Sequence, residues 1–151
     1  MSTLSLTGAD TVKINDRNLS DFGDGDFAHV TFPSNLGEVK TGKNGNSIFA
    51  QDWKGDNAEM TLRLIRGSAD DAFMLGLMAQ MKADFSAFTL LKGEFTKRVG
   101  DGVGNVKSDV YVLAGGIFYK NVEVKSNAEG DTEQSVSIYT MKYAKAARLI
   151  S

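Results

Sequence analysis

The sequence contains no cysteine, one histidine and one proline among its 151 residues. Without cysteine the chain cannot form a disulfide, a thiolate zinc site, an iron–sulfur cluster or a thiol nucleophile. The single histidine, His29, excludes any site that needs two imidazoles from one chain. These absences point away from most enzyme chemistry. We identify no catalytic residue, no metal ligand and no cofactor-binding residue in the pattern that remains.

Long apolar runs and an excess of positive charge are also missing. Lys and Arg number 17 and Asp and Glu number 19, which gives a formal net charge of -2. We therefore expect no large patch for gripping phosphate backbones. No apolar segment approaches the roughly 20 residues needed to cross a bilayer, so we expect no membrane insertion. The first residues, MSTLSLTGAD, show no secretory signal. We expect a soluble product made in the cytoplasm.

The length favours one domain over residues 1–151. Nine of its 16 glycines lie in four clusters, at residues 23–25, 42–45, 100–104 and 115–116. Between these clusters, apolar and polar residues alternate with period two, which is typical of strands joined by turns. The segments with this pattern are residues 3–7, 11–15, 27–32, 60–65, 109–113, 117–125 and 134–143. We expect a turn over residues 127–131 to join the last two. For residues 143–150 the pattern does not decide between strand and helix.

One helix is predicted over residues 69–82. Ser68 is a good N-cap, and Asp70 and Asp71 fall in the first turn, where the helix dipole favours acids. The helix is apolar around its whole circumference, whereas a surface helix should keep a polar face. Its second apolar side then needs a partner, such as another chain or the mouth of a closed barrel into which the helix is plugged. The apolar residues are Ala72, Phe73, Met74, Leu75, Leu77, Met78, Ala79 and Met81.

Three segments could suggest ligand binding, and each has a simpler structural interpretation. Residues 100–105 resemble a glycine-rich phosphate loop, but a strand pattern follows where a helix is needed. Residues 21–26 are acidic, but they lack the ligand spacing of a calcium loop. The third segment, residues 37–47, is long, polar and rich in glycine. Loops of this length in a compact domain are functional or mobile, and its lysines could contact phosphate or an acidic neighbour.

The order of these segments resembles the tail tube proteins of bacteriophages with contractile tails. A strand with Val12-Lys-Ile-Asn15 is followed by an acidic turn, a second strand over residues 27–32 and the long loop with Lys43-Asn-Gly45. The strand over residues 59–66 then runs directly into Gly67-Ser68-Ala-Asp-Asp71 and the apolar helix. This amphipathic strand entering a capped helix is the most specific part of the resemblance.

The resemblance implies a mainly β fold, an antiparallel β-sandwich or partial barrel with one flanking helix. It also implies hexameric rings that stack into a tube in the virion tail. The implied partners are other copies of the chain and the sheath, tape measure, baseplate and tail-terminator proteins, with DNA passing through during ejection. The implied subunit-interface residues are Lys40, Lys43, Asn44, Phe73, Met74, Leu77, Met78 and Met81. The candidate lumen-facing residues are Glu59, Thr61 and Arg63 on one strand and Lys120 and Glu123 on another.

Other functions remain open from sequence alone. The inner tube of a related contractile injection system, such as a type VI secretion system or a phage-tail-like bacteriocin, would share this fold and assembly. A small-ligand-binding β-barrel would need an apolar pocket and could use the helix as a lid. An enzyme that uses only carboxylates would need two acids facing each other across a cleft, and the sequence singles out no such pair.

Overall fold

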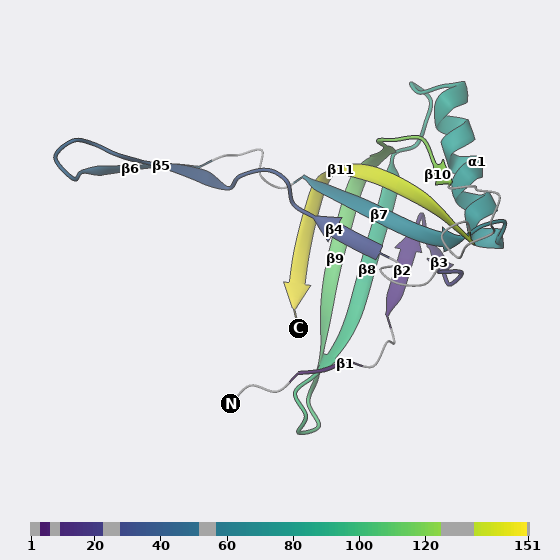
Figure 1. The fold of residues 1–151 in the computed structure, drawn as a ribbon, viewed down its shortest axis with the longest axis horizontal. Helices are drawn as coiled ribbons and strands as arrows, with labels where there is room; N and C mark the ends of the chain where they lie inside the picture. The colour runs from purple at the N-terminus through teal and green to yellow at the C-terminus, as the bar shows by residue number, and fades with distance from the viewer. Residues whose placement is uncertain (1–3, 7–9, 23–27, 52–56, 125–134, 151) are drawn as a thin grey trace.

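A computed structural model describes residues 4–6, 10–22, 28–51, 57–124 and 135–150. These residues form a nine-stranded antiparallel sheet, a separate two-stranded sheet and one helix (Figure 1). The path through the large sheet is β3-β2-β8-β9-β11-β7-β4, with β1 on β8 and β10 on β11. The bounds are β1 Ser5–Leu6, β2 Thr11–Ile14, β3 Arg17–Leu19, β4 Ala28–Thr31, β5 Gly37–Thr41, β6 Ser47–Gln51, β7 Ala58–Ile65, α1 Ala69–Ala83, β8 Leu91–Gly100, β9 Val106–Phe118, β10 Glu123–Val124 and β11 Val136–Ile150.

The large sheet curls into a half-barrel with the helix at one end, so the mainly β fold with one flanking helix is confirmed. Alternation along β7 explains which face is inside. Met60, Leu62 and Leu64 are fully buried, while the residues between them are only half-buried. On the adjacent strand β11, Tyr139 and Met141 are buried in the same core. The concave face of the sheet is therefore the hydrophobic face.

Helix α1 begins at the predicted residue, because the Ser68 hydroxyl accepts the backbone N–H of Asp71 at 3.2 Å. Met74 and Met78 are fully buried in the core of their own chain. The expectation that these two residues contact another subunit is wrong. The helix lies against one end of the half-barrel and packs both methionines into the core there.

Two glycines lie inside a strand where the sequence predicted a turn. β9 runs without interruption from Val106 to Phe118, through Gly115, which has a φ of 67°, and Gly116. Glycine adopts a positive φ without steric cost, and β9 continues through Gly115 without ending. Lys120 therefore lies after the strand and not within it, which corrects the prediction. Residues 143–150 are strand, as part of β11. The predicted turns at 23–25 and 127–131 lie outside the described residues.

Candidate assembly surfaces

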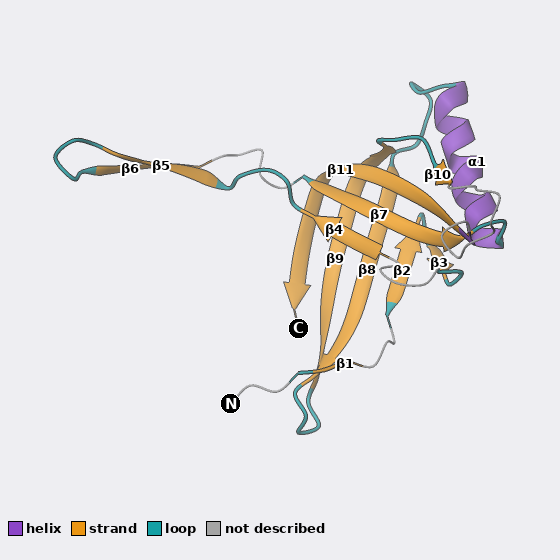
Figure 2. Ribbon diagram, in the orientation of Figure 1, coloured by secondary structure: helices purple, strands orange, loops and turns teal. Residues whose placement is uncertain are grey.

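The hairpin β5–β6 projects away from the body of the molecule as a sheet of its own (Figure 2). Every residue in both strands is exposed. Its turn is well formed, since the N–H of Gly42 donates to the carbonyl of Asn46 at 2.6 Å and Gly45 has a φ of 83°. The polar loop predicted over residues 37–47 is thus one strand and the tip of this hairpin.

Both faces of the hairpin carry exposed apolar side chains. Val39 and Phe49 are cross-strand partners and are 62% and 76% exposed. Ile48, on the opposite face beside Lys40, is exposed as well. A lone two-stranded hairpin is marginally stable in water at best, and apolar residues exposed on both of its faces favour burial against a partner.

The predicted interface residues fall into two separate groups. Lys40 lies in β5, and Lys43 and Asn44 lie in the turn, and all are exposed. Phe73, Leu77 and Met81 lie on the helix, at the opposite end of the molecule (Figure 1). These three are partly buried and pack against the core of their own chain. Whether any of them meets another subunit stays a prediction.

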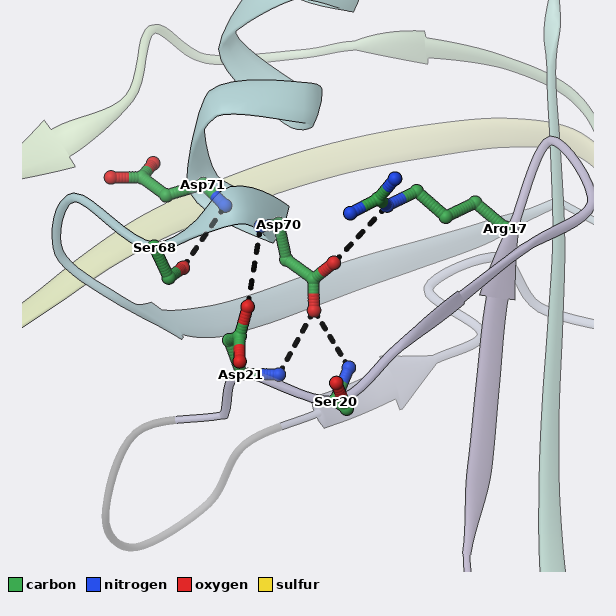
Figure 3. Close-up of polar contacts among 6 residues, drawn as sticks. All are labelled: Arg17, Ser20, Asp21, Ser68, Asp70 and Asp71. Atoms are coloured by element: carbon green, nitrogen blue, oxygen red, sulfur yellow. Dashed lines mark hydrogen bonds and ion pairs between the residues drawn. The ribbon is translucent and has the colours of Figure 1, made fainter.

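Asp70 anchors the start of the helix to the turn that follows β3 (Figure 3). Its carboxylate accepts the backbone N–H groups of Ser20 and Asp21 at 2.7 and 2.9 Å, and Arg17 Nε at 3.1 Å. Burial raises the pKa of the Asp70 carboxyl, but these hydrogen bonds and the guanidinium charge outweigh it and hold the pKa below its usual value. The sequence suggested helix capping for this acid, and nothing in the sequence indicated its partner Arg17.

Asp71 joins the same helix turn to β11. The Ser137 hydroxyl donates to Asp71 Oδ2 at 3.0 Å, and the Tyr139 hydroxyl donates to Oδ1 at 2.5 Å. Burial raises the pKa of the Tyr139 phenol, and the carboxylate beside it raises the pKa further. The N–H of Gly67 also donates to this carboxylate, at 2.9 Å. Two adjacent acids thus fix the helix to two different parts of the sheet.

The polar residues of β7 share the face opposite the core. Glu59 pairs with Lys142, and Thr61 lies between Thr140 and His29. Arg63 pairs with Ile138, which also pairs with Glu123 of β10. Because cross-strand partners share a face, the structure brings Glu123 and Arg63 into one row. The predicted grouping of Glu59, Thr61 and Arg63 on one face is confirmed, and their position in a lumen stays a prediction.

No protein-family model matches the chain, and no curated protein matches its sequence. Within the described ranges, no group of three or more His, Cys, Asp or Glu side chains is placed to hold a metal ion. In the same ranges, no helix has the length and hydropathy to span a membrane.

Proposed function

We propose that this chain is a structural subunit that assembles with copies of itself into hexameric rings, and that stacked rings form the tail tube of a bacteriophage with a contractile tail. The observation that carries the proposal is the projecting β5–β6 hairpin. Its exposed apolar residues, Val39, Ile48 and Phe49, lie on a separate two-stranded sheet. Such a sheet gains stability when another surface covers it.

The position of the hairpin favours assembly into a ring or tube rather than a twofold dimer. It leaves the body on the side opposite the helix (Figure 1), so it can cover a neighbouring copy whose own hairpin points onward. A contact between two different surfaces of identical chains is heterologous, and it generates closed rings or open filaments. The family resemblance favours six subunits per ring and stacking of the rings.

The charge distribution supports a conduit that does not grip DNA. The net charge is -2. On the face of the sheet opposite the core, the cross-strand row along β7 and β11 contains Glu59, Arg63 and Lys142 among neutral side chains. Such a surface has no stripe of positive charge to hold phosphates. Contacts with sheath, tape measure, baseplate and tail-terminator proteins, and a place in the virion, belong to the same proposal through the family resemblance.

The inner tube of a related injection system follows from the same observation, and neighbouring genes would separate the two. A small-ligand-binding barrel has less support. The concave side of the half-barrel is filled by the chain's own large side chains. Tyr139, Tyr143, Met60 and Met141 are all essentially inaccessible to solvent.

Negative-stain microscopy and native mass measurement of the purified chain test the proposal. We expect rings or tubes, with masses at multiples of 16.3 kDa. Replacing both Val39 and Phe49 with Ser should abolish them while the melting temperature stays within a few degrees, because both side chains are exposed. The matched control is Val103→Ser, an equally exposed apolar residue at the β8–β9 tip. A wild-type chain that remains monomeric at high concentration would contradict the proposal.

A further inference from the structure

The projecting hairpin β5–β6 is joined to the body by a connection that the structure describes, residues 32–36. This connection starts at Phe32, directly after β4, and ends where β5 begins, at Gly37. Its second residue is Pro33, whose ring restricts the backbone. Among the described residues, β5 and β6 pair only with each other. The direction in which the hairpin leaves the body therefore depends on how its connections are fixed.

Phe32 packs on an aromatic side chain of the large sheet. Its ring lies 6.1 Å from the ring of Tyr111 in β9, and the two ring planes are inclined by only 28°. Phe95 of β8 meets the same tyrosine edge-on, with ring centroids 6.0 Å apart. Aromatic rings in these arrangements attract each other beyond the effect of the area that they bury. Phe32 thus joins a cluster of rings that the sheet itself supports.

The last part of β11 completes this aromatic cluster. The Arg148 guanidinium lies 5.5 Å from the centre of the Tyr111 ring, within the range of a cation–π contact. Arg148 Nε and Nη2 donate to the two carboxylate oxygens of Asp109 at 2.9 and 2.7 Å. These hydrogen bonds hold the pKa of the Asp109 carboxyl below its usual value. A bidentate pair of this kind has a fixed geometry, so the tyrosine on which Phe32 stacks is itself held in place.

Beyond Phe32, the connection is separated from β11 by a hollow. A groove of about 820 Å³ lies between residues 34–37 on one side and residues 146–148 on the other. Leu36, on the first of these walls, is 72% exposed, whereas Phe32 is 40% exposed. The connection therefore rests on the sheet at Phe32 and then spans the groove before the hairpin begins.

We infer that Phe32 is a positioning residue, whose stack on Tyr111 sets the direction of the hairpin and so presents the exposed apolar side chains of β5 and β6 to their partner. This inference rests on the proposed self-assembly and names the residue that prepares the hairpin for it. A segment that is already held in its binding orientation loses less conformational entropy when it binds. Phe32 thus favours association through the hairpin and needs no contact of its own with the partner.

Because the chain contains no cysteine, two engineered cysteines test this role without interference. Lys43→Cys in the hairpin turn and Val103→Cys at the β8–β9 tip are both at exposed positions. Spin labels on both cysteines of the dilute, monomeric full-length chain report the distance between tip and body. We expect one narrow distance distribution. Phe32→Ala should broaden it about twofold, because the connection gains conformational freedom, and should shift the melting temperature by only a few degrees.

Two further variants separate the ring contact from a general effect of mutation. Phe32→Tyr keeps a ring that can stack and should preserve the narrow distribution. Leu36→Ala changes an exposed residue of the same connection and should also preserve it. Rings and tubes of the unlabelled proteins should follow the same order. Phe32→Ala should assemble about tenfold less at equal concentration, since a mobile hairpin loses more entropy on binding, and the other two variants should assemble like the wild type.

The two measurements together decide the inference. A broad distribution in the wild type, or an equally narrow one in Phe32→Ala, would overturn it even if that variant assembled poorly. Normal rings from a variant with a broadened distribution would also overturn it and would leave the proposed function standing. A wild-type chain that stays monomeric at high concentration would overturn both the proposed function and the inference that rests on it.

Discussion

Tyr143 and Gly116 are cross-strand partners of β11 and β9, and the phenol ring lies over the glycine where a side chain would begin. Gly93 of β8 faces the same ring, because a Cβ there would lie 2.8 Å from the phenol oxygen. Burial raises the pKa of this phenol, whose hydroxyl donates to the Met141 sulfur at 3.6 Å. Two glycines on neighbouring strands thus make the space for one buried tyrosine at the centre of the sheet.

Gly116→Ala should therefore destabilise the protein. The added methyl group overlaps the Tyr143 ring, and overpacking of a buried site costs about 1–3 kcal/mol. Gly76→Ala is the matched control, because a Cβ at this helical position meets nothing within 4 Å and alanine favours helix by up to about 1 kcal/mol. Urea unfolding of both variants measures the difference. Equal effects on the free energy of unfolding would contradict the packing argument.

Asp70→Ala should cost about 3 kcal/mol of unfolding free energy. It removes a buried carboxylate and leaves Arg17 and two backbone N–H groups without their acceptor. Asp84→Ala, at the exposed end of the same helix, is the control and should cost under about 1 kcal/mol. Thermal unfolding followed by circular dichroism would measure both. A loss at Asp84 as large as that at Asp70 would refute the anchoring role.

The stabilisation that Asp70 gives the folded protein should decrease as the pH falls. Its folded-state pKa lies below the unfolded value of about 3.9. The stabilisation is therefore complete above this unfolded value and is lost as the pH falls through the folded pKa. The gap in stability between the wild type and Asp70→Asn should be constant from about pH 5 to 7 and should narrow below pH 4. A gap that widens on acidification would contradict the depressed pKa.

Substitutions on the two sides of helix α1 should have different effects on stability. Met78→Glu places a carboxylate in the core, where Met78 is 1% exposed, and should cost more than about 3 kcal/mol or unfold the chain. Leu75→Glu changes a residue that is 50% exposed and should leave the melting temperature within a few degrees. Thermal unfolding checks both variants. If Met78→Glu folded normally and lost only assembly, the assignment of this side to the core would be wrong.

The β7–α1 junction shows which features the local sequence pattern predicts and which it does not. Alternation from residue 60 and the Ser68 cap predicted the strand and the helix, because these depend on neighbours a few residues apart. The same reasoning assigned Met74 and Met78 to another subunit. An apolar helix needs cover on two sides, but the sequence does not say that the curled sheet and the helix close one core between them.

Of the candidate surfaces, the sequence indicated one and only the structure revealed the other. Lys40, Lys43 and Asn44 were singled out from a polar, glycine-rich segment, and the structure places all three on the projecting hairpin. The groove at β11 could not be found from sequence. One of its walls begins at Phe32, which stacks on Tyr111, far away in the sequence.

By itself the sequence determined the strand-rich class, the helix and the absence of thiol and paired-imidazole chemistry, since these follow from composition and short-range periodicity. Only the tertiary structure decided which glycines turn the chain and which admit Tyr143, which side of the helix is core, and which ring Phe32 stacks on. Those properties come from contacts between residues distant in the sequence, such as Arg17 with Asp70 and Gly116 with Tyr143. Local pattern cannot encode such contacts, because each depends on how the whole sheet curls.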